Sequence, residues 1–208
     1  MRNFNYSAIK YQKWDSEILG LIAAIYKEAG KQEMYLRQRP EGLDKLVEIA
    51  KIQSTEASNA IEGIVTTSTR MRQLVEEKTT PKNRDEQEIA GYRDVLNVIH
   101  DSFDAIPITK NYILQLHKML YSHMNNPLAG QTKNVQNYVS ATYPDGHVEV
   151  LFTPLAPFET QEALDRICEE YNRVIGNMEL EPLIAIPVFI HDFLCIHCLL
   201  YTSPSPRD

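Results

Sequence analysis

The sequence predicts an all-α fold that carries one β-hairpin. Most apolar residues recur every three or four positions, the spacing that gathers them on one face of a helix. Across residues 138–152 the pattern changes to alternation around a Pro-Asp-Gly turn, which is typical of a hairpin. The chain has 208 residues, 43% hydrophobic and 24% charged, so it is long enough to bury a core.

In the first half of the chain, the helices are predicted from caps, stops and apolar stripes. Asp15 or Ser16 begins the first helix, and a second helix follows Pro40 and runs toward Gly63. A short helix spans about residues 69–77, before a Thr-Thr-Pro-Lys-Asn loop. The stripes of the longer helices are Ile18, Leu21, Ile22, Ile25 and Ala29; Leu43, Leu46, Val47, Ala50, Ala57 and Ile61; and Ile89, Tyr92, Leu96, Ile99 and Phe103.

In the second half, helices flank the hairpin on both sides. Thr109 caps one of them, and another resumes at Phe158 and stops at Gly176. The last helix opens at Glu181-Pro182, because a proline at the first helical position sacrifices no hydrogen bond. The apolar residues of the first two of these helices are Ile113, Leu116, Leu120, Leu164, Ile167, Cys168, Tyr171 and Val174.

The hairpin is the one predicted β element in a helical chain, so it must pack against the helices to be stable. Pro144 fixes one backbone dihedral of the turn, and Gly146 admits a positive φ. Val148, Val150 and Phe152 are expected to share one side. An exposed strand can pair with an incoming peptide, so one interpretation is a binding edge. A decorated loop without a binding role is the other interpretation, and the spacing leaves both open.

Composition excludes several classes of function. The net charge of -7, without a basic cluster, argues against nucleic-acid binding. The N-terminal residues lack the apolar core and the cleavage site of a signal peptide. The apolar run at residues 183–200 is interrupted by Pro187, His191 and Asp192, which favours a buried helix over a membrane span. Three cysteines, an odd number, indicate a reducing compartment, and we expect a cytoplasmic protein.

Few residues suggest chemistry without reference to any family. His191 and Cys195 lie four positions apart on one helix face, which is a spacing that a zinc site can use. No second pair has ligand spacing, and we expect no metal site and cysteines that pack as small apolar residues. His197 follows a buried helix, where a histidine is suited to acid–base work near neutral pH. A core or capping histidine is the alternative.

The stretch TEASNAIEGI, residues 55–64, is the second unusual feature. Ser58 and Glu62 lie four positions apart on one helix face, and Gly63 ends the helix. A glutamate in the last turn is disfavoured by the helix dipole, which attracts cations there. Glu62 is therefore expected either to face a cation from elsewhere in the fold or to be an ordinary solvated residue.

Two of these segments resemble the Fic family. The pattern Ser58-x-x-x-Glu62-Gly63 is similar to the inhibitory-helix signature of Fic proteins that carry this helix ahead of the core. The stretch AGQTKNVQNYV, residues 129–139, is similar to the glycine-led segment before the family's flap. Lys133 stands where an arginine is common. The hairpin then corresponds to the flap.

The last helix carries the most specific resemblance. Residues 151–172 resemble the run from the flap into the next core helix. Residues 186–197, IPVFIHDFLCIH, resemble the helix that leads into the Fic motif H-x-F-x-(D/E)-G-N-G-R-x-x-R, and His197 falls on its histidine. The resemblance implies transfer of AMP from ATP to a Ser, Thr or Tyr hydroxyl of a target protein. It also implies that His197 takes the proton of that hydroxyl.

The resemblance further implies cofactors, regulation and a docking surface. In the family, ATP binds the Gly-Asn-Gly turn, and the acidic residue of the motif holds Mg²⁺. The final arginine of the motif grips the γ-phosphate, and the inhibitory glutamate, here Glu62, pairs with that arginine. The flap docks the target as an added strand, and its expected docking residues are Tyr138, Val139, Val148, Glu149, Val150 and Leu151.

The sequence after His197 departs from the motif. Residues 198–208 have no phenylalanine at the third motif position, no acidic Mg²⁺ ligand and no Gly-Asn-Gly, and Arg207 lies at the wrong offset. We expect this tail to be foreign to the natural protein and the chain as written to be inactive, binding neither ATP nor Mg²⁺ well. An apolar patch on the last helix is expected to favour aggregation.

These features give a predicted organisation. An N-terminal helical region spans residues 1–80 and includes the inhibitory helix at about 41–63. A partial Fic core spans residues 81–197 with its flap at about 138–152, and the tail covers residues 198–208. The alternative is a non-catalytic interaction module or regulator that docks peptides on its hairpin. No membrane partner is expected, and a homo-oligomer is compatible with either interpretation.

Overall fold

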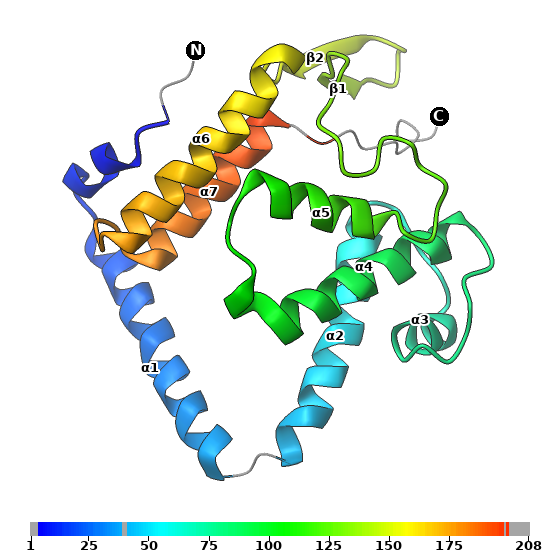
Figure 1. The fold of residues 1–208 in the computed structure, drawn as a ribbon, viewed down its shortest axis with the longest axis horizontal. Helices are drawn as coiled ribbons and strands as arrows, with labels where there is room; N and C mark the ends of the chain where they lie inside the picture. Colours follow the sequence, from blue (N-terminus) through cyan, green and yellow to red (C-terminus); the bar gives the residue numbers. More distant parts are fainter. Residues whose placement is uncertain (1–3, 39–40, 198, 200–208) are drawn as a thin grey trace. The chain divides into compact units, whose positions relative to one another are not determined.

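The computed structural model describes residues 4–38, 41–197 and 199, and it confirms an all-α fold with one hairpin (Figure 1). The predicted tail therefore lies outside the described residues, apart from Leu199. No described helix is long and apolar enough to cross a membrane. In chain order the elements are η1 (Tyr6–Tyr11), α1 (Ser16–Gln38), α2 (Glu41–Ile61), α3 (Ser68–Val75), α4 (Arg84–Ser102), η2 (Phe103–Ala105), α5 (Lys110–Leu120), β1 (Val139–Thr142), β2 (Val148–Phe152), α6 (Pro157–Gly176) and α7 (Pro182–Ile196).

The predicted helix caps are present. The Asp15 carboxylate accepts from the N–H of Ile18 at 2.8 Å and begins α1. The Thr109 hydroxyl caps α5 in the same way, at 3.3 Å from the N–H of Tyr112. Pro182 occupies the first helical position of α7, as its missing N–H permits. Local sequence signals therefore decide where these helices begin.

Contacts among residues divide the chain into two compact units. One, here called the α6/α7 unit, comprises residues 1–11, 106–118 and 127–208. The other, here called the α2–α4 unit, comprises residues 12–105 and 119–126. The predicted boundary near residue 80 stays a prediction.

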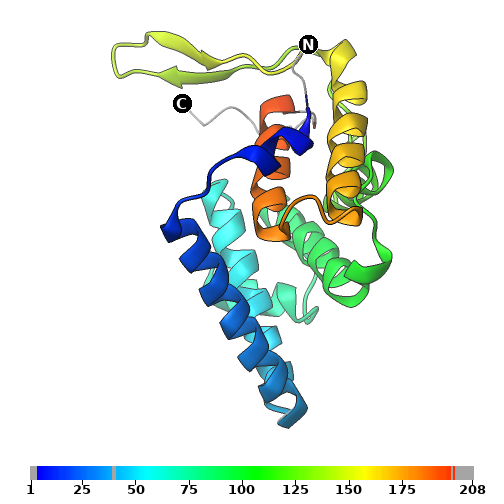
Figure 2. The same cartoon turned by 90° about the vertical axis from the view of Figure 1, so that its left-hand side faces the viewer.

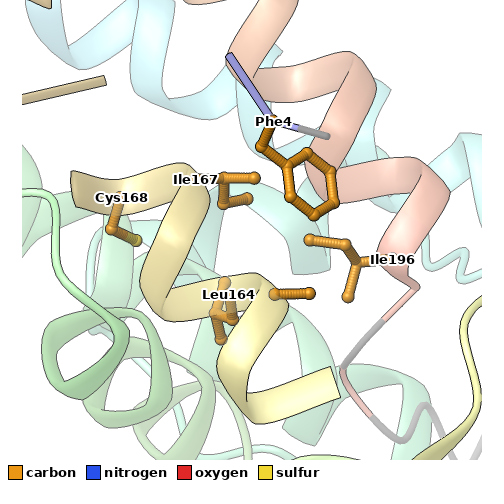
Figure 3. Packing of buried hydrophobic residues seen from close by; sticks show 6 residues of the cluster. Phe4, Leu164, Ile167, Cys168 and Ile196 are labelled. Carbon is orange, nitrogen blue, oxygen red and sulfur yellow. The ribbon is translucent and has the colours of Figure 1, made fainter. Parts of the chain in front are cut away.

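The core of the α6/α7 unit lies where α6 and α7 pack side by side (Figures 1 and 3). Leu164 and Ile167 of α6 and Ile196 of α7 are fully buried there. Phe4, from the N-terminal segment, closes the same cluster. Ile196 directly precedes His197, so burial of apolar area anchors the residue before the predicted catalytic histidine.

Within the α6/α7 unit, the N-terminal segment packs against helices α6 and α7, a contact that the sequence did not predict. Tyr6 of η1 is 2% exposed and packs in a cluster with Val174 of α6 and Ala185 of α7. The backbone N–H of Tyr6 donates to the Glu170 carboxylate at 3.1 Å. The hydroxyl of Ser7 donates to Glu179 at 2.9 Å. These contacts connect residues more than 160 positions apart, and no local pattern announces them.

The core of the α2–α4 unit is formed by α3 and α4, with Met71, Leu74 and Ile89 buried together. Gly91 of α4 faces the backbone of α5 at its last residue. A Cβ at position 91 would lie 1.9 Å from the carbonyl oxygen of Leu120, so only glycine allows this approach.

The apolar side predicted for α2 differs from the side that the structure buries. Leu46 is 60% exposed and Ile61 is 84% exposed, whereas Thr55 and Asn59 are buried. The side-chain amide of Asn59 donates to the carbonyl of Thr55 at 2.8 Å, which satisfies a polar group inside the unit. Of the predicted stripe of α1, Leu21 and Ile25 are 58% and 51% exposed, whereas Ile18 and Ile22 are half-buried.

The hairpin prediction is confirmed. Strands β1 and β2 pair antiparallel, with Thr142 opposite Val148, and Figure 2 shows them as an arm that extends past α6 and α7. The turn closes through Gly146 at φ +81°, whose N–H donates to the carbonyl of Tyr143 at 2.9 Å. The register shifts between Val139 and Ser140, so Leu151 bulges out of the ladder.

Candidate functional site

The candidate site lies at the C-terminal end of α7. His197 is the C-cap residue of this helix and has left-handed backbone angles, φ 47° and ψ 54°. Its N–H still donates to the carbonyl of Phe193 at 3.1 Å, which closes the last turn. A non-glycine residue with positive φ is uncommon and is often found at functional sites. This backbone angle turns the imidazole out of the helix while Ile196 stays in the core.

The glycine-led segment at residues 129–137 contacts the end of α7. Gly130 has φ +77°, and a Cβ there would come within 2.9 Å of the Lys118 side chain. The N–H of Gly130 donates to Nδ1 of His117 at 3.0 Å. Burial lowers the pKa of His117, so this ring stays a neutral acceptor. Gly130 and His117 together fix the start of the segment.

Lys133 closes the C-terminus of α7 with a charge. Its side chain is almost fully buried, at 2% exposure. The ammonium donates to the carbonyl of Ile196 at 3.2 Å and to Oδ1 of Asn137 at 2.8 Å. A cation at the end of a helix is stabilised by the helix dipole and by the otherwise unpaired carbonyls. Lys133, which stands where an arginine is common in the Fic family, therefore has a structural role in the fold.

Asn137 connects Lys133 to the candidate catalytic residue. Its Nδ2 lies 2.5 Å from Nδ1 of His197 and 3.4 Å from the carbonyl oxygen of His197. His197 is an exposed residue, but partial desolvation of its imidazole, followed by the nearby positive charge of Lys133, lowers the pKa of His197. The imidazole is therefore neutral at neutral pH, the state in which a histidine can act as a base.

The predicted docking hairpin starts directly after Asn137. The side-chain amide of Gln136 donates to the carbonyl of Pro154 at 3.1 Å, which joins the two ends of the arm. Both strands are exposed, and the tyrosine before the turn, Tyr143, donates to Glu149 at 2.8 Å. This hydrogen bond, with burial, raises the pKa of Tyr143. The predicted docking residues Tyr138, Val139, Val148, Glu149, Val150 and Leu151 are all exposed on this arm.

The predicted inhibitory residues lie in the α2–α4 unit. Ser58 is half-buried and accepts a hydrogen bond from the hydroxyl of Tyr92 at 2.9 Å, so it joins α2 to α4. Glu62 is exposed at the end of α2. A cation partner for Glu62 stays a prediction.

Gly63 ends α2 as predicted. It has φ +74°, and its N–H donates to the carbonyl of Ala60 at 3.0 Å. The N–H of Ile64 donates to the carbonyl of Asn59 at 2.9 Å. These two bonds form the Schellman closure, in which glycine supplies the left-handed residue.

His191 and Cys195 have the spacing of metal ligands on α7. The sulfur of Cys195 lies 3.7 Å from Nε2 of His191. Over residues 4–38 and 41–197, no group of three or more His, Cys, Asp or Glu side chains is placed to hold a metal ion. Cys168 packs in the core as predicted, where burial raises the pKa of its thiol to about 11. Cys198 lies outside the described residues.

Comparison with known proteins shows what the segment that contains this site is similar to. Residues 107–200 match the model of the Fic/DOC family. The fold is similar to that of a Fic domain-containing signaling protein from Bacteroides thetaiotaomicron VPI-5482, with a TM-score of 0.66 and 22% identity. The match covers 77% of this chain and spans 60% of that protein's length. No curated protein matches.

The Fic segment holds α5, the hairpin, α6, α7 and His197, but the residues present do not fit Mg²⁺. The acidic residue that the Fic motif would supply is absent from residues 198–208, and the described residues contain no carboxylate cluster to replace it. Asn137 is the site residue that sequence reasoning missed. Nothing in AGQTKNVQNYV distinguishes Asn137 from Asn134; only the fold brings one of them to His197.

Proposed function

We propose that this chain is part of a Fic-type protein adenylyltransferase, which transfers AMP from ATP to a Ser, Thr or Tyr hydroxyl of a target protein. The observation that carries the proposal is the position of His197 at the end of α7, in contact with Asn137 and inside the segment that matches the Fic/DOC model. His197 acts as the base that accepts the proton of the target hydroxyl.

The hairpin docks the target. Its strands are exposed on both edges, and an extended peptide can add to such an edge through backbone hydrogen bonds. Apolar side chains along the arm, including Val150 at 52% exposure, offer contacts for the side chains of that peptide. The arm starts one residue after Asn137, so a docked segment comes next to the group that contacts His197.

Glu62 regulates the reaction in this proposal. A glutamate at the unfavourable end of a helix is suited to pair with an arginine. That arginine belongs to the phosphate-binding part of the motif, which residues 198–208 do not contain. ATP and Mg²⁺ are therefore assigned to a version of the protein in which the chain continues from His197 into that loop.

The experiment has two steps. The source locus is first sequenced through the codon for His197 and beyond, and the encoded protein is expressed. Its labelling by ATP that is radioactive at the α-phosphate is then compared for wild type, Glu62→Gly and, as a control on the same helix, Glu56→Ala. We expect more label with Glu62→Gly and no change with Glu56→Ala. Equal labelling by all three proteins would refute the inhibitory role of Glu62.

A second candidate function rests on the same hairpin. If the natural gene encodes residues 198–208 and then stops, peptide docking without catalysis becomes the better hypothesis. A library of extended peptides screened by fluorescence anisotropy against the chain, with Val150→Lys as the control, tests this alternative. Binding that Val150→Lys abolishes would support it, and no binding at all would exclude it.

A further inference from the structure

We infer that Lys133 and Asn137 are positioning residues that hold the imidazole of His197 neutral, with its proton on Nε2 and its lone pair engaged at Nδ1. The catalytic meaning of this inference rests on the proposed function. The geometry itself concerns only the described residues of the α6/α7 unit.

The first step is the orientation of the Asn137 amide. An ammonium has only donors, so Lys133, at 2.8 Å, must face the oxygen of that amide. The NH₂ group then faces the ring of His197 at 2.5 Å. Turning the amide by half a rotation would place NH₂ against NH₃⁺, and two donors would meet. Lys133 therefore fixes which end of Asn137 the histidine contacts.

The second step is the tautomer. The NH₂ group of Asn137 is a donor, so Nδ1 of His197 must accept, and the proton of the neutral ring is on Nε2. Protonation of Nδ1 would again set two donors against each other. The lowered pKa of His197, caused by burial and then by Lys133, agrees with this arrangement.

Among the described residues, no second charged group is found to shift the pKa of His197. Lys133 is the charged group that acts on His197, and it comes from the glycine-led segment. The last turn of α7, residues 193–196, is Phe-Leu-Cys-Ile, with Cys195 as its titratable residue. Leu199 pairs with Thr132 as an isolated bridge next to the same segment. The charge that acts on the His197 ring and the hydrogen bond to its Nδ1 therefore both come from residues 132–137.

The consequence concerns proton transfer. In this structure the lone pair on Nδ1 of His197 accepts the hydrogen bond from Asn137. The ring can accept a proton at Nδ1 only when the N–H of Asn137 moves away. Asn137 lies immediately before Tyr138 and close to the start of β1, so the residue that holds Nδ1 of His197 belongs to the segment that leads into the hairpin.

Nuclear magnetic resonance of the chain with ¹⁵N-labelled histidine tests the inference without ATP or target. The wild type should show His197 as the Nε2–H tautomer, titrating below the ordinary histidine pKa. Asn137→Asp puts an acceptor at Nδ1, so the tautomer should switch to Nδ1–H and the pKa should rise by about 1 or more. Lys133→Met should also raise the pKa, and Lys133→Arg should restore the wild-type value. The exposed neighbour Asn134→Ala should change nothing.

A second measurement needs only dilute protein. Diethylpyrocarbonate acylates a free imidazole lone pair, so the engaged Nδ1 of His197 should react slowly. Asn137→Ala should speed modification of His197 several-fold by mass spectrometry, while the exposed His191 serves as an internal reference. A wild-type Nδ1–H tautomer, or equal rates for wild type and Asn137→Ala, would overturn the inference. These readouts are independent of AMP transfer, so a failure of the proposed function leaves them unchanged.

Discussion

The ion pair of Arg70 and Glu86 joins α3 to α4 and gives the clearest quantitative prediction. The Glu86 carboxylate accepts from Nε and Nη2 of Arg70 at 2.8 and 2.5 Å, and from the N–H of Lys82 at 2.8 Å. Its residue is 4% exposed. The hydrogen bond from Arg70 is the main cause that lowers the pKa of Glu86 from 4.5 to about 2.

Linkage converts this shift into stability. A carboxyl whose pKa is lower in the folded state stabilises it above the unfolded pKa, and the contribution is lost as the pH falls through the folded pKa. For Glu86 the loss runs from about pH 5 to pH 2 and amounts to up to about 3 kcal/mol. Glu86→Gln should remove a contribution of this size at pH 7, because Arg70 loses its charged partner.

Native-state hydrogen exchange of the α4 amides is the assay, because it reports opening of the α2–α4 unit alone. Glu86→Gln should lower their opening free energy at pH 7 and flatten its dependence on pH between 5 and 2. Glu88→Gln is the control, since Glu88 pairs with Arg84 at 2.9 Å on the same helix and should change it by only about 0.5 kcal/mol. The reasoning is refuted if the two variants lose equal stability at pH 7.

Three further predictions use single contacts. Gly91→Ala should destabilise the α2–α4 unit by about 3 kcal/mol in urea unfolding, because its Cβ meets a backbone carbonyl at 1.9 Å; a loss under 1 kcal/mol would contradict the close approach. Ser58→Ala and Tyr92→Phe should be non-additive by about 1 kcal/mol in a double-mutant cycle, and strict additivity would mean that their hydrogen bond at 2.9 Å does not form in solution. At pH 8, iodoacetamide should alkylate Cys195 much faster than Cys168, whose pKa is about 11, and equal rates would show that Cys168 is not buried.

The sequence predicts much of the fold because caps and stops act locally. Asp15, Thr109, Pro182 and Gly63 set helix ends in the structure where the sequence places them. The hairpin turn is local too, since Gly146 supplies the positive φ that it needs. Each of these signals depends on neighbours within a few positions.

Tertiary contacts decide what the sequence could not. The apolar period of α2 predicts an inward stripe through Leu46 and Ile61, but the structure buries Thr55 and Asn59 instead, on a helix that contacts both α3 and α4. A helix that is apolar on several sides does not specify which side is covered. The packing of Tyr6 against α6 depends on residues at the opposite end of the chain.

The candidate site divides in the same way. The sequence predicts His197 because residues 186–197 resemble the helix that leads into the Fic motif. Asn137 has no local signature, because its function depends on Lys133 and His197 meeting it in space. The exposed face of α7, which includes Leu194 at 62% exposure, agrees with the predicted apolar patch.

The most direct test of the central claim is labelling by the protein that the source locus encodes, in two parallel reactions. One reaction uses ATP that is radioactive at the α-phosphate, and the other uses ATP that is radioactive at the γ-phosphate. The account predicts that protein acquires label from the α-position only and that His197→Ala abolishes this labelling. Label from the γ-position, or full α-labelling by His197→Ala, would contradict an adenylyl transfer that depends on His197.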